Sequence, residues 1–214
     1  MRKWPLVVAP TALVLALALW TTLVAFSLWT QRAQLDQSAI ALAKIDAIAN
    51  LRKDMAIRKW AETIGGVYVN EDKMPNLDSL ETQEHLAHTR PGGETLKLVS
   101  ITPIHILLAI QEISHQIYGN RERLTSLQLR NRANAPDEWE AGALKSLQGG
   151  AEVAVETMPR QAGGHGLLRL MIPMKMDKEC LECHRDTLVP VGGLRGGASI
   201  SIDLNTYRTA QEPA

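Results

Sequence analysis

The chain opens with a long apolar run. From Trp4 to Thr30 there is no charged residue, and this exceeds the roughly 20 residues that an α-helix needs to cross a membrane. Arg2 and Lys3 precede the run, and positive charge on that side predicts an N-terminus inside the cell and the remainder outside. Residues 1–30 are therefore expected to form a transmembrane anchor in contact with membrane lipid.

A cleaved signal peptide is the alternative interpretation of the same run. The apolar region of a signal peptide is usually shorter and ends in a small-residue cleavage site. Ala25-Phe26-Ser27 is a poor version of such a site. We favour an uncleaved, single-pass anchor, and with either interpretation the rest of the chain leaves the cytoplasm.

Residues 31–64 have a helical pattern. Apolar side chains recur near helical spacing, at Leu35, Leu42, Ile45, Ile48 and Ala49. Charged residues are left for the solvent-exposed faces, namely Lys44, Arg52, Lys53, Asp54 and Arg58. The pattern predicts a long juxtamembrane helix and a candidate stalk for a homodimer, although its repeat is too irregular for a coiled coil.

Beyond Gly65-Gly66 the pattern changes to short segments separated by turn residues. Candidate strands lie at 67–69, 96–101, 124–129, 152–158, 166–174 and 198–203, and candidate helices follow Thr102-Pro103 and Asn134. Residues 70–93 are polar and are expected to form a loop with at most one short helix. The sequence predicts an α+β domain over 65–205 with about five strands, and a tail over 206–214.

Composition narrows the functional classes. The 23 basic and 23 acidic residues give a formal net charge of zero, so nothing indicates a nucleic-acid partner. There is a single Phe, so aliphatic side chains must form most of the core.

Near the C-terminus stands Cys180-Leu181-Glu182-Cys183-His184. C-x-x-C-H is the attachment signature of c-type haem: the two thiols bond to the porphyrin and the histidine ligates the iron. A zinc site normally needs a second cysteine pair, and a thioredoxin-like pair sits in a βαβ unit. These are the only two cysteines, and their flanks do not predict such a unit. We therefore expect one covalent haem c, with His184 as a metal ligand.

Several segments together resemble a bacterial family of haem-c-binding, PAS-like domains. Arg58 to Val69 is similar to its R-x-W-x-x-x-x-G-G-V-Y-V opening, and the stretch from Leu98 to Ile113 resembles its strand-to-helix segment. Further similar segments are Leu124 to Leu127, Asn134 to Glu140, Met171 with Pro173, and Gly196 to Ile200. The resemblance implies a PAS-like fold with a central antiparallel sheet and the haem on one side of it. It also implies sensing of redox state or of a diatomic gas.

The sequence alone does not identify the second axial ligand of the haem iron. His105 ranks first, because it opens a helix directly after an apolar strand that the resemblance assigns to the wall of the haem pocket. The family has Tyr at that position. Met55 is the alternative, on the juxtamembrane helix, and an open site ranks third. His115, Met171, Met174 and Met176 are weaker candidates.

Three arginines are candidates for binding the haem propionates, because a guanidinium group binds a carboxylate in bidentate fashion. They are Arg58, Arg123 and Arg130. For each of them a surface salt bridge is the simpler interpretation.

Two functions from different classes fit these features. The first is a membrane-anchored, periplasm-facing c-type haem protein in the bacterial inner membrane. It would act as a redox or small-gas sensor module without its own transmitter, and would need a signalling partner protein. The second is an electron-transfer cytochrome, such as an accessory subunit of a membrane complex. No acid–base pair suited to peroxide chemistry stands out, so we do not expect an enzyme.

Overall fold

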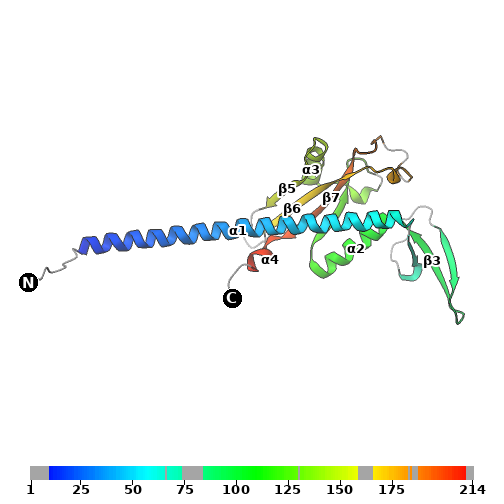
Figure 1. Ribbon diagram of the computed structural model, residues 1–214, viewed down its shortest axis with the longest axis horizontal. Helices are drawn as coiled ribbons and strands as arrows, with labels where there is room; N and C mark the ends of the chain where they lie inside the picture. Colours follow the sequence, from blue (N-terminus) through cyan, green and yellow to red (C-terminus); the bar gives the residue numbers. More distant parts are fainter. Residues whose placement is uncertain are drawn as a thin grey trace, which may run out of the picture.

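In the computed structural model, a single helix covers residues 10–63 (Figure 1). The structure describes residues 10–65, 67–73, 84–129, 131–158, 166–182, 184 and 188–210. Helix α1 runs from Pro10 to Thr63 without a break, so the predicted anchor and juxtamembrane helix are one element. Its apolar part has a mean hydropathy of 2.1, enough for a membrane span, a property that a signal sequence shares.

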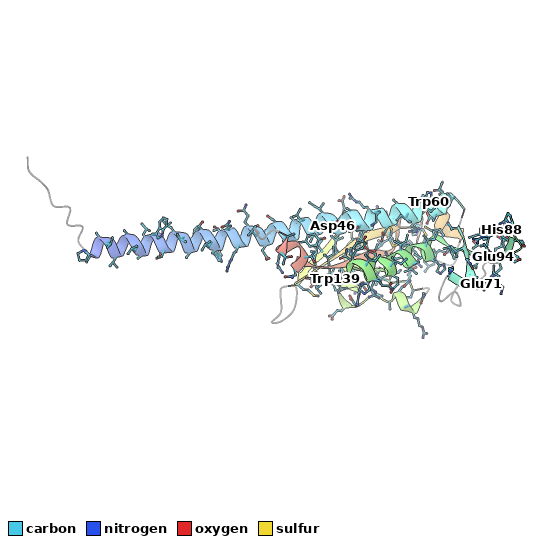
Figure 2. All side chains as sticks on the ribbon, turned by 90° about the horizontal axis from the view of Figure 1, so that it is seen from below. Asp46, Trp60, Glu71, His88, Glu94 and Trp139 are labelled. Carbon is cyan, nitrogen blue, oxygen red and sulfur yellow. The ribbon has the colours of Figure 1, made fainter. Side chains whose placement is uncertain are left out.

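The two halves of α1 have different surroundings. The N-terminal half projects away from the rest of the protein, with its side chains free of the domain (Figures 1 and 2). From Ala39 onward one face of the helix is buried, with Ala39, Ala43, Ala47 and Leu51 fully covered. Their spacing of four residues keeps them on one stripe, and alanine lets the helix axis approach its neighbours closely.

The stripe packs on a four-stranded antiparallel sheet with the order β4-β7-β6-β5. Its strands are β4 (Arg121–Thr125), β5 (Ala154–Met158), β6 (Leu167–Lys175) and β7 (Leu194–Asp203). Strands β6 and β7 form the longest pairing, with Leu170 opposite Ile200. Alternate side chains point to opposite faces of a sheet. Strands β6 and β7 therefore contribute side chains to a hydrophobic cluster on each face of this sheet.

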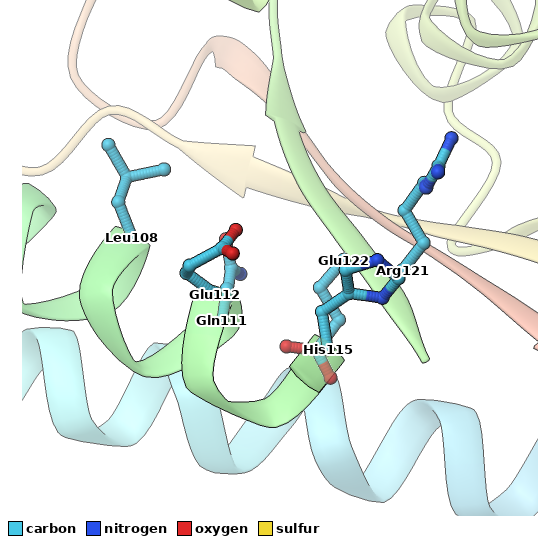
Figure 3. A pocket seen from close by; sticks show the side chains of 6 residues that line it. All are labelled: Leu108, Gln111, Glu112, His115, Arg121 and Glu122. Carbon is cyan, nitrogen blue, oxygen red and sulfur yellow. The ribbon is translucent and has the colours of Figure 1, made fainter. Parts of the chain in front are cut away.

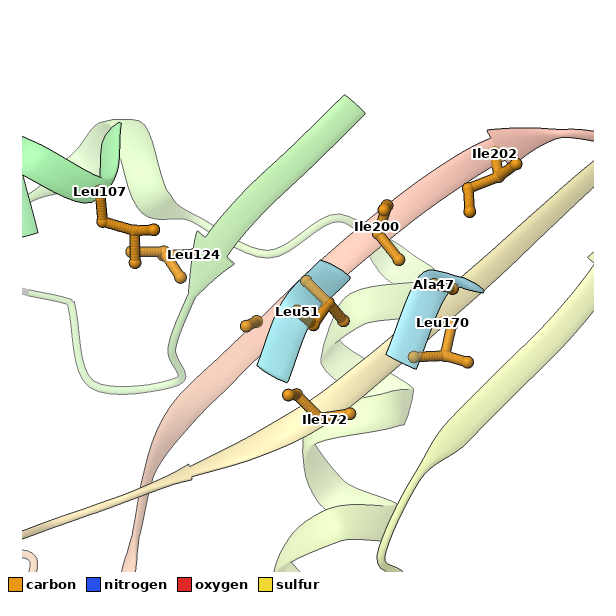
Figure 4. Packing of buried hydrophobic residues seen from close by; sticks show 9 residues of the cluster. Ala47, Leu51, Leu107, Leu124, Leu170, Ile172, Ile200 and Ile202 are labelled. Carbon is orange, nitrogen blue, oxygen red and sulfur yellow. The ribbon is translucent and has the colours of Figure 1, made fainter. Parts of the chain in front are cut away.

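The main core lies between the sheet, α1 and α2 (Pro103–Tyr118). Figure 4 shows Leu51 of α1 above the sheet, close to Ile172 and Ile200. The members of this central cluster are Ala47, Leu51, Leu107, Leu124, Leu170, Ile172, Ala198, Ile200 and Ile202.

The opposite face of the sheet is covered by α3 (Glu138–Gln148). Met171, between two residues of the central cluster, faces Leu144 and Leu147 of this helix. A Cβ on Gly197 would overlap the Met171 side chain, so glycine is required where the strand passes beneath it.

The start of α3 is fixed by a capping box, in which the Asp137 carboxylate accepts from the Glu140 amide and the Glu140 carboxylate accepts from the Asp137 amide. Glu140 is fully buried, and Arg123 Nη1 and Ser199 Oγ donate to it at 2.9 and 2.8 Å. A buried carboxylate needs such partners. Arg169 also lies 4.4 Å over the Trp139 ring and joins the same network.

A second antiparallel sheet, of order β1-β3-β2, stands apart from the main body (Figure 1). It comprises β1 (Val67–Asn70), β2 (His85–Thr89) and β3 (Thr95–Ile101). Short 3-10 helices lie at η1 (Glu71–Lys73), η3 (Arg132–Asn134) and η4 (Glu179–Glu182).

The predicted α+β class is confirmed, with four differences in detail. The polar stretch 70–93 contains strand β2, where the sequence predicts a loop. Segment 96–101 is a strand, but it belongs to the small sheet and not to the central one. The strand predicted at 124–129 lies at 121–125. A last helix, α4 (Leu204–Thr209), replaces the start of the predicted tail and packs on α1, where Tyr207 donates to Asp46.

Replacement of Leu51 by Ala tests the packing of α1 on the sheet. We expect a loss of about 2–5 kcal/mol in the free energy of unfolding, because a fully buried leucine leaves a cavity. Urea unfolding followed by circular dichroism measures it. Leu42→Ala is the control, since Leu42 is 50% exposed on the same helix. If both variants lost the same free energy of unfolding, the buried face of α1 would not be what holds the helix on the sheet.

Candidate functional site

The C-x-x-C-H motif follows β6 and begins in η4. We call residues 177–184 the attachment turn; of these, Cys183 lies outside the described residues. Cys180 is buried, 9% exposed, and its sulfur accepts from the Asp177 amide at 3.4 Å. The His184 amide donates to the Cys180 carbonyl at 2.9 Å. A hydrogen bond between residues four apart therefore links the first cysteine to the histidine.

Helix α1 holds the attachment turn from its C-terminal end. Arg58 Nη2 lies 3.2 Å from Cys180 Sγ and 2.7 Å from the Glu62 carboxylate. Lys59 Nζ lies 3.3 Å from the Glu179 carboxylate, and the hydrogen bond to this group raises the pKa of Lys59. Two consecutive basic residues thus connect α1 to Cys180 and to Glu179, the residue before the motif.

His184 is oriented by β7. Arg195 Nη2 lies 3.4 Å from His184 Nδ1, and Arg195 Nη1 donates to Ser126 Oγ at 2.8 Å and to the Gln128 carbonyl at 3.0 Å. Sequence reasoning missed Arg195, because only the pairing of β7 with its neighbours shows that it reaches the histidine. An arginine can only donate, so Nδ1 is the acceptor in this arrangement.

The two candidates for a second axial ligand lie on different helices. His105 is in the first turn of α2, where its Nδ1 is 2.6 Å from Thr102 Oγ1, and burial lowers the pKa of its imidazole. Met55 is partly buried on α1 and packs against the central cluster. It lies three residues before Arg58, so both are on neighbouring faces of one helical turn.

Segment 96–101, which precedes His105 and was expected to form a wall of the central sheet, belongs to the small sheet. The structure therefore removes this reason for preferring His105. Met55, by contrast, is one turn from the residue that contacts Cys180.

The arginines expected near a haem have different partners. Arg58 lies beside Cys180 and is paired with Glu62. Arg123 is paired with the buried Glu140, and Arg130 lies outside the described residues. Of the weaker ligand candidates, Met171 and Met176 are fully buried, Met174 packs against the central cluster, and His115 Nδ1 donates to the Asn120 carbonyl.

The comparisons with known proteins concern the family and the fold of the chain. The sequence model of the Tll0287-like family matches residues 30–202, from the middle of α1 to the end of β7. The chain belongs to the Tll0287-like family. A solved structure, described as the crystal structure of the cyanobacterial heme-protein Tll0287, matches 76% of this chain and 94% of its own with a TM-score of 0.50. The identity is 15%, so this likeness concerns the fold. No curated protein matches the chain.

The Tll0287-like match confirms the family resemblance drawn from the motifs. It includes both sheets, helices α2 and α3, and the attachment turn.

One cluster in this Tll0287-like domain has no counterpart in the sequence prediction. Asp54, expected on a solvent-exposed face of α1, is 1% exposed, and Gln111 Nε2 of α2 donates to it at 3.2 Å. Glu122 of β4 is the third member. Burial raises the pKa of Glu122 to about 7, and its hydrogen bond to Asp54 and the charge of Asp54 add to the effect. We call Asp54, Gln111 and Glu122 the carboxyl cluster.

Glu122 should make the protein less stable at higher pH. Its pKa is raised from 4.5 to about 7 in the folded state, so its stabilising contribution is present below about pH 4.5 and is lost as the pH rises through about 7. Glu122→Gln should reduce the fall in unfolding free energy between pH 5 and pH 8 by about 1–2 kcal/mol, allowing for solvent screening of a half-buried group. Urea unfolding at the two pH values measures this.

Glu94→Gln is the control, because Glu94 is exposed in the β2–β3 hairpin and pairs only locally with Arg90. Its pH dependence should match that of the natural protein. If the Glu122→Gln variant kept the full pH dependence of the natural protein, Glu122 would not be the source of that dependence.

Proposed function

We propose that this chain is a membrane-anchored haem protein that acts as a redox or small-gas sensor module. The observation that supports it best is the contact between the attachment turn and α1, through Arg58 and Lys59. The turn would hold one c-type haem, and α1 is continuous with the apolar segment. A haem supplies an iron that changes oxidation state and binds diatomic gases.

The donor set of the turn fits a covalent haem. Cys180 and Cys183 would form the thioether bonds, and His184 would ligate the iron. Ligation through Nε2 leaves the proton on Nδ1, whereas Arg195 donates to Nδ1 in the present arrangement. We therefore expect the imidazole to turn away from Arg195 in the haem-bound protein, and Arg195 Nη2 to donate to a propionate in its place.

The contacts of α1 favour a sensor over an electron carrier. An electron carrier needs a fixed haem at a surface that its partner reaches. It does not need a contact between the haem site and the helix that leads to the apolar segment. Here the basic pair Arg58 and Lys59 would move with any displacement of the attachment turn. The alternative remains an electron-transfer cytochrome, and axial ligation separates the two. We assign the protein no catalytic reaction.

We propose that α1 spans the inner membrane, with the domain in the periplasm. The apolar composition of its first half and the basic residues at positions 2 and 3 support this orientation. Haem c is attached on that side of the membrane in bacteria.

A homodimer through residues 31–64 is part of the same proposal. Away from its buried stripe α1 exposes large apolar side chains, with Leu42 50%, Ile45 66% and Trp60 56% exposed, and Leu35, in line with the stripe but before the domain, is 39% exposed. Two copies anchored in one membrane would hold these stripes parallel, which lowers the entropic cost of association.

For the second axial position we propose Met55 ahead of His105. Its helix already reaches the attachment turn through Arg58. His105 remains the alternative, because burial lowers the pKa of its imidazole and so favours the neutral form that can ligate a metal.

Haem attachment is tested by replacing Cys180 and Cys183 with Ala. We expect a protein without covalent haem, visible as loss of staining on a haem-stained denaturing gel. Lys178→Ala, in the same turn and exposed, should stain like the natural protein. A natural protein that does not stain would refute the proposal.

The axial ligand is tested by optical spectra of Met55→Ala and His105→Ala, with and without carbon monoxide. If Met55 is the ligand, its removal should abolish the weak near-infrared sulfur-to-iron band, shift the iron to high spin and permit carbon monoxide binding. Ile48→Ala and His115→Ala are the matched controls. A change in His105→Ala alone would assign the ligand to His105, and no change in either would indicate an open site, which favours gas sensing.

A further inference from the structure

Beside the domain, one face of α1 is occupied. Ala43, Ala47 and Leu51 are fully buried on this face. Nearer the C-terminal end of the helix the same face meets α2 and β4. Figure 3 shows Gln111 of α2 and Glu122 of β4 where these elements meet, next to α1. The domain thus takes up this side of the helix.

The opposite face of the same stretch is exposed. Leu42 is 50% and Ile45 66% exposed, and Ser38 and Ala49 are also exposed. Ile45 and Ala49 each lie two residues from the buried Ala47, a rotation of about 200° around the helix. We call Ser38, Leu42, Ile45 and Ala49 the outer seam.

The outer seam has the spacing of a coiled coil. Its residues follow one another at intervals of four, three and four positions, as the a and d positions of a heptad repeat do. In the sequence this repeat is interrupted by Ile48. In the structure Ile48 packs against the central cluster and so belongs to the domain side. The structure therefore separates two stripes that overlap in the sequence, and the exposed one is regular.

The same spacing continues into the apolar segment. Toward the N-terminus it passes through Leu35, Gln31, Leu28 and Val24, and α1 is unbroken along this line. If α1 spans the membrane as proposed, a partner that follows the line must be a long helix that enters the membrane beside it. A second copy of α1 meets this requirement, because two identical helices anchored in one membrane run parallel and at equal depth.

The part of the seam outside the apolar segment supplies the attraction. In lipid, apolar side chains gain little from contact with one another, whereas Leu42 and Ile45 leave water when the helices pair. Four side chains per copy make a smaller contact than the about 1,200–2,000 Å² that stable complexes of free proteins bury. Confinement of both copies to one membrane compensates for this, because it raises their effective concentration.

The next position of the repeat limits how far the pairing extends. Arg52 is exposed and follows Ala49 at an interval of three. Pairing there would bring the two Arg52 guanidinium groups together, and like charges repel. The last turns of α1, with Arg58 and Lys59 at the attachment turn, would therefore stay separate in the two copies.

We propose that α1 pairs in parallel with α1 of a second copy through the outer seam, and that this pairing ends at Ala49. The proposal rests on the membrane-anchored homodimer of the proposed function and assigns its contact to one face of the helix. The unpaired turns beyond Ala49 are those that contact the attachment turn. A displacement of that turn would thus act on the two helices just beyond the point where they separate.

Cysteine cross-linking of the full-length, haem-bound chain in membrane vesicles tests which face pairs. Leu42→Cys, Ile45→Cys and Ala49→Cys each place two thiols close together across the seam. Oxidation with copper phenanthroline should convert each of these variants to a disulfide-linked dimer on a non-reducing gel. Lys44→Cys is the matched control, exposed on the same helix but off the seam, and should remain monomeric. Ala56→Cys, beyond the proposed end of the pairing, should also remain monomeric.

Association itself is measured separately, as co-purification of two differently tagged copies from a detergent extract. Ile45→Glu should reduce the amount of the co-purified copy by about tenfold or more, because it adds two like charges to the seam. Lys44→Glu should leave the amount unchanged. Both positions are exposed, so circular dichroism and haem staining should match the natural protein in both variants.

The proposal is overturned if Lys44→Cys cross-links as fully as the seam variants, or if no seam variant cross-links. Equal co-purification of Ile45→Glu and Lys44→Glu also overturns it. Cross-linking of Ala56→Cys to the extent of Ala49→Cys overturns the end of the pairing at Ala49. Natural copies that do not co-purify refute the homodimer itself, whereas natural copies that co-purify without seam cross-links refute only this face. Haem staining of the same samples reports separately on haem attachment.

Discussion

The close approach of α1 to the central sheet is the contact on which most of the structure depends. Ala39, Ala43 and Ala47 are fully buried and leave no side chain long enough to hold the helix away from β6 and β7. Leu51 then fills the space between Ile172 and Ile200. Because the cost of burying alanine is low in side-chain entropy, the helix gains contact area without losing rotamer freedom. The same stripe then continues to Asp54 and Arg58, and so brings the carboxyl cluster and the attachment turn to one helix.

Buried charge is handled in two contrasting ways on the two sides of the sheet. On the α3 side, Glu140 is surrounded by donors from Arg123, Ser199 and the Asp137 amide. A fully buried carboxylate is stable there because its lone pairs are satisfied. On the α1 side, Asp54 receives one donor from Gln111 and faces a second carboxyl group at Glu122. The first arrangement satisfies its carboxylate, whereas the second leaves Gln111 Oε1 buried and without a partner among the described residues.

Much of this architecture was predictable from the sequence, because its signals are local. Such local signals predict the helix over the apolar run, the helix that starts at Pro103, and the strands at 67–69 and 166–174. The features that were missed depend on tertiary contacts. Asp54 follows a polar pattern on α1, and only α2 and β4 bury it. Strand β2 is exposed along its length and is stabilised by pairing with β3, not by an alternating pattern. The residues of β3 likewise do not reveal which sheet the strand joins. The position of His105, which follows β3, could therefore not be predicted either.

The continuity of α1 has a mechanical consequence. Between residues 11 and 63 there is no glycine or proline, the usual causes of a sharp kink. The part that precedes the buried stripe, residues 10–38, extends about 44 Å at about 1.5 Å per residue. A tilt of about 5° at the domain would carry the far end sideways by about 4 Å. The chain thus contains one stiff helix that connects the attachment turn to the apolar segment, so that a rotation at the domain displaces the far end of the apolar segment by several ångströms.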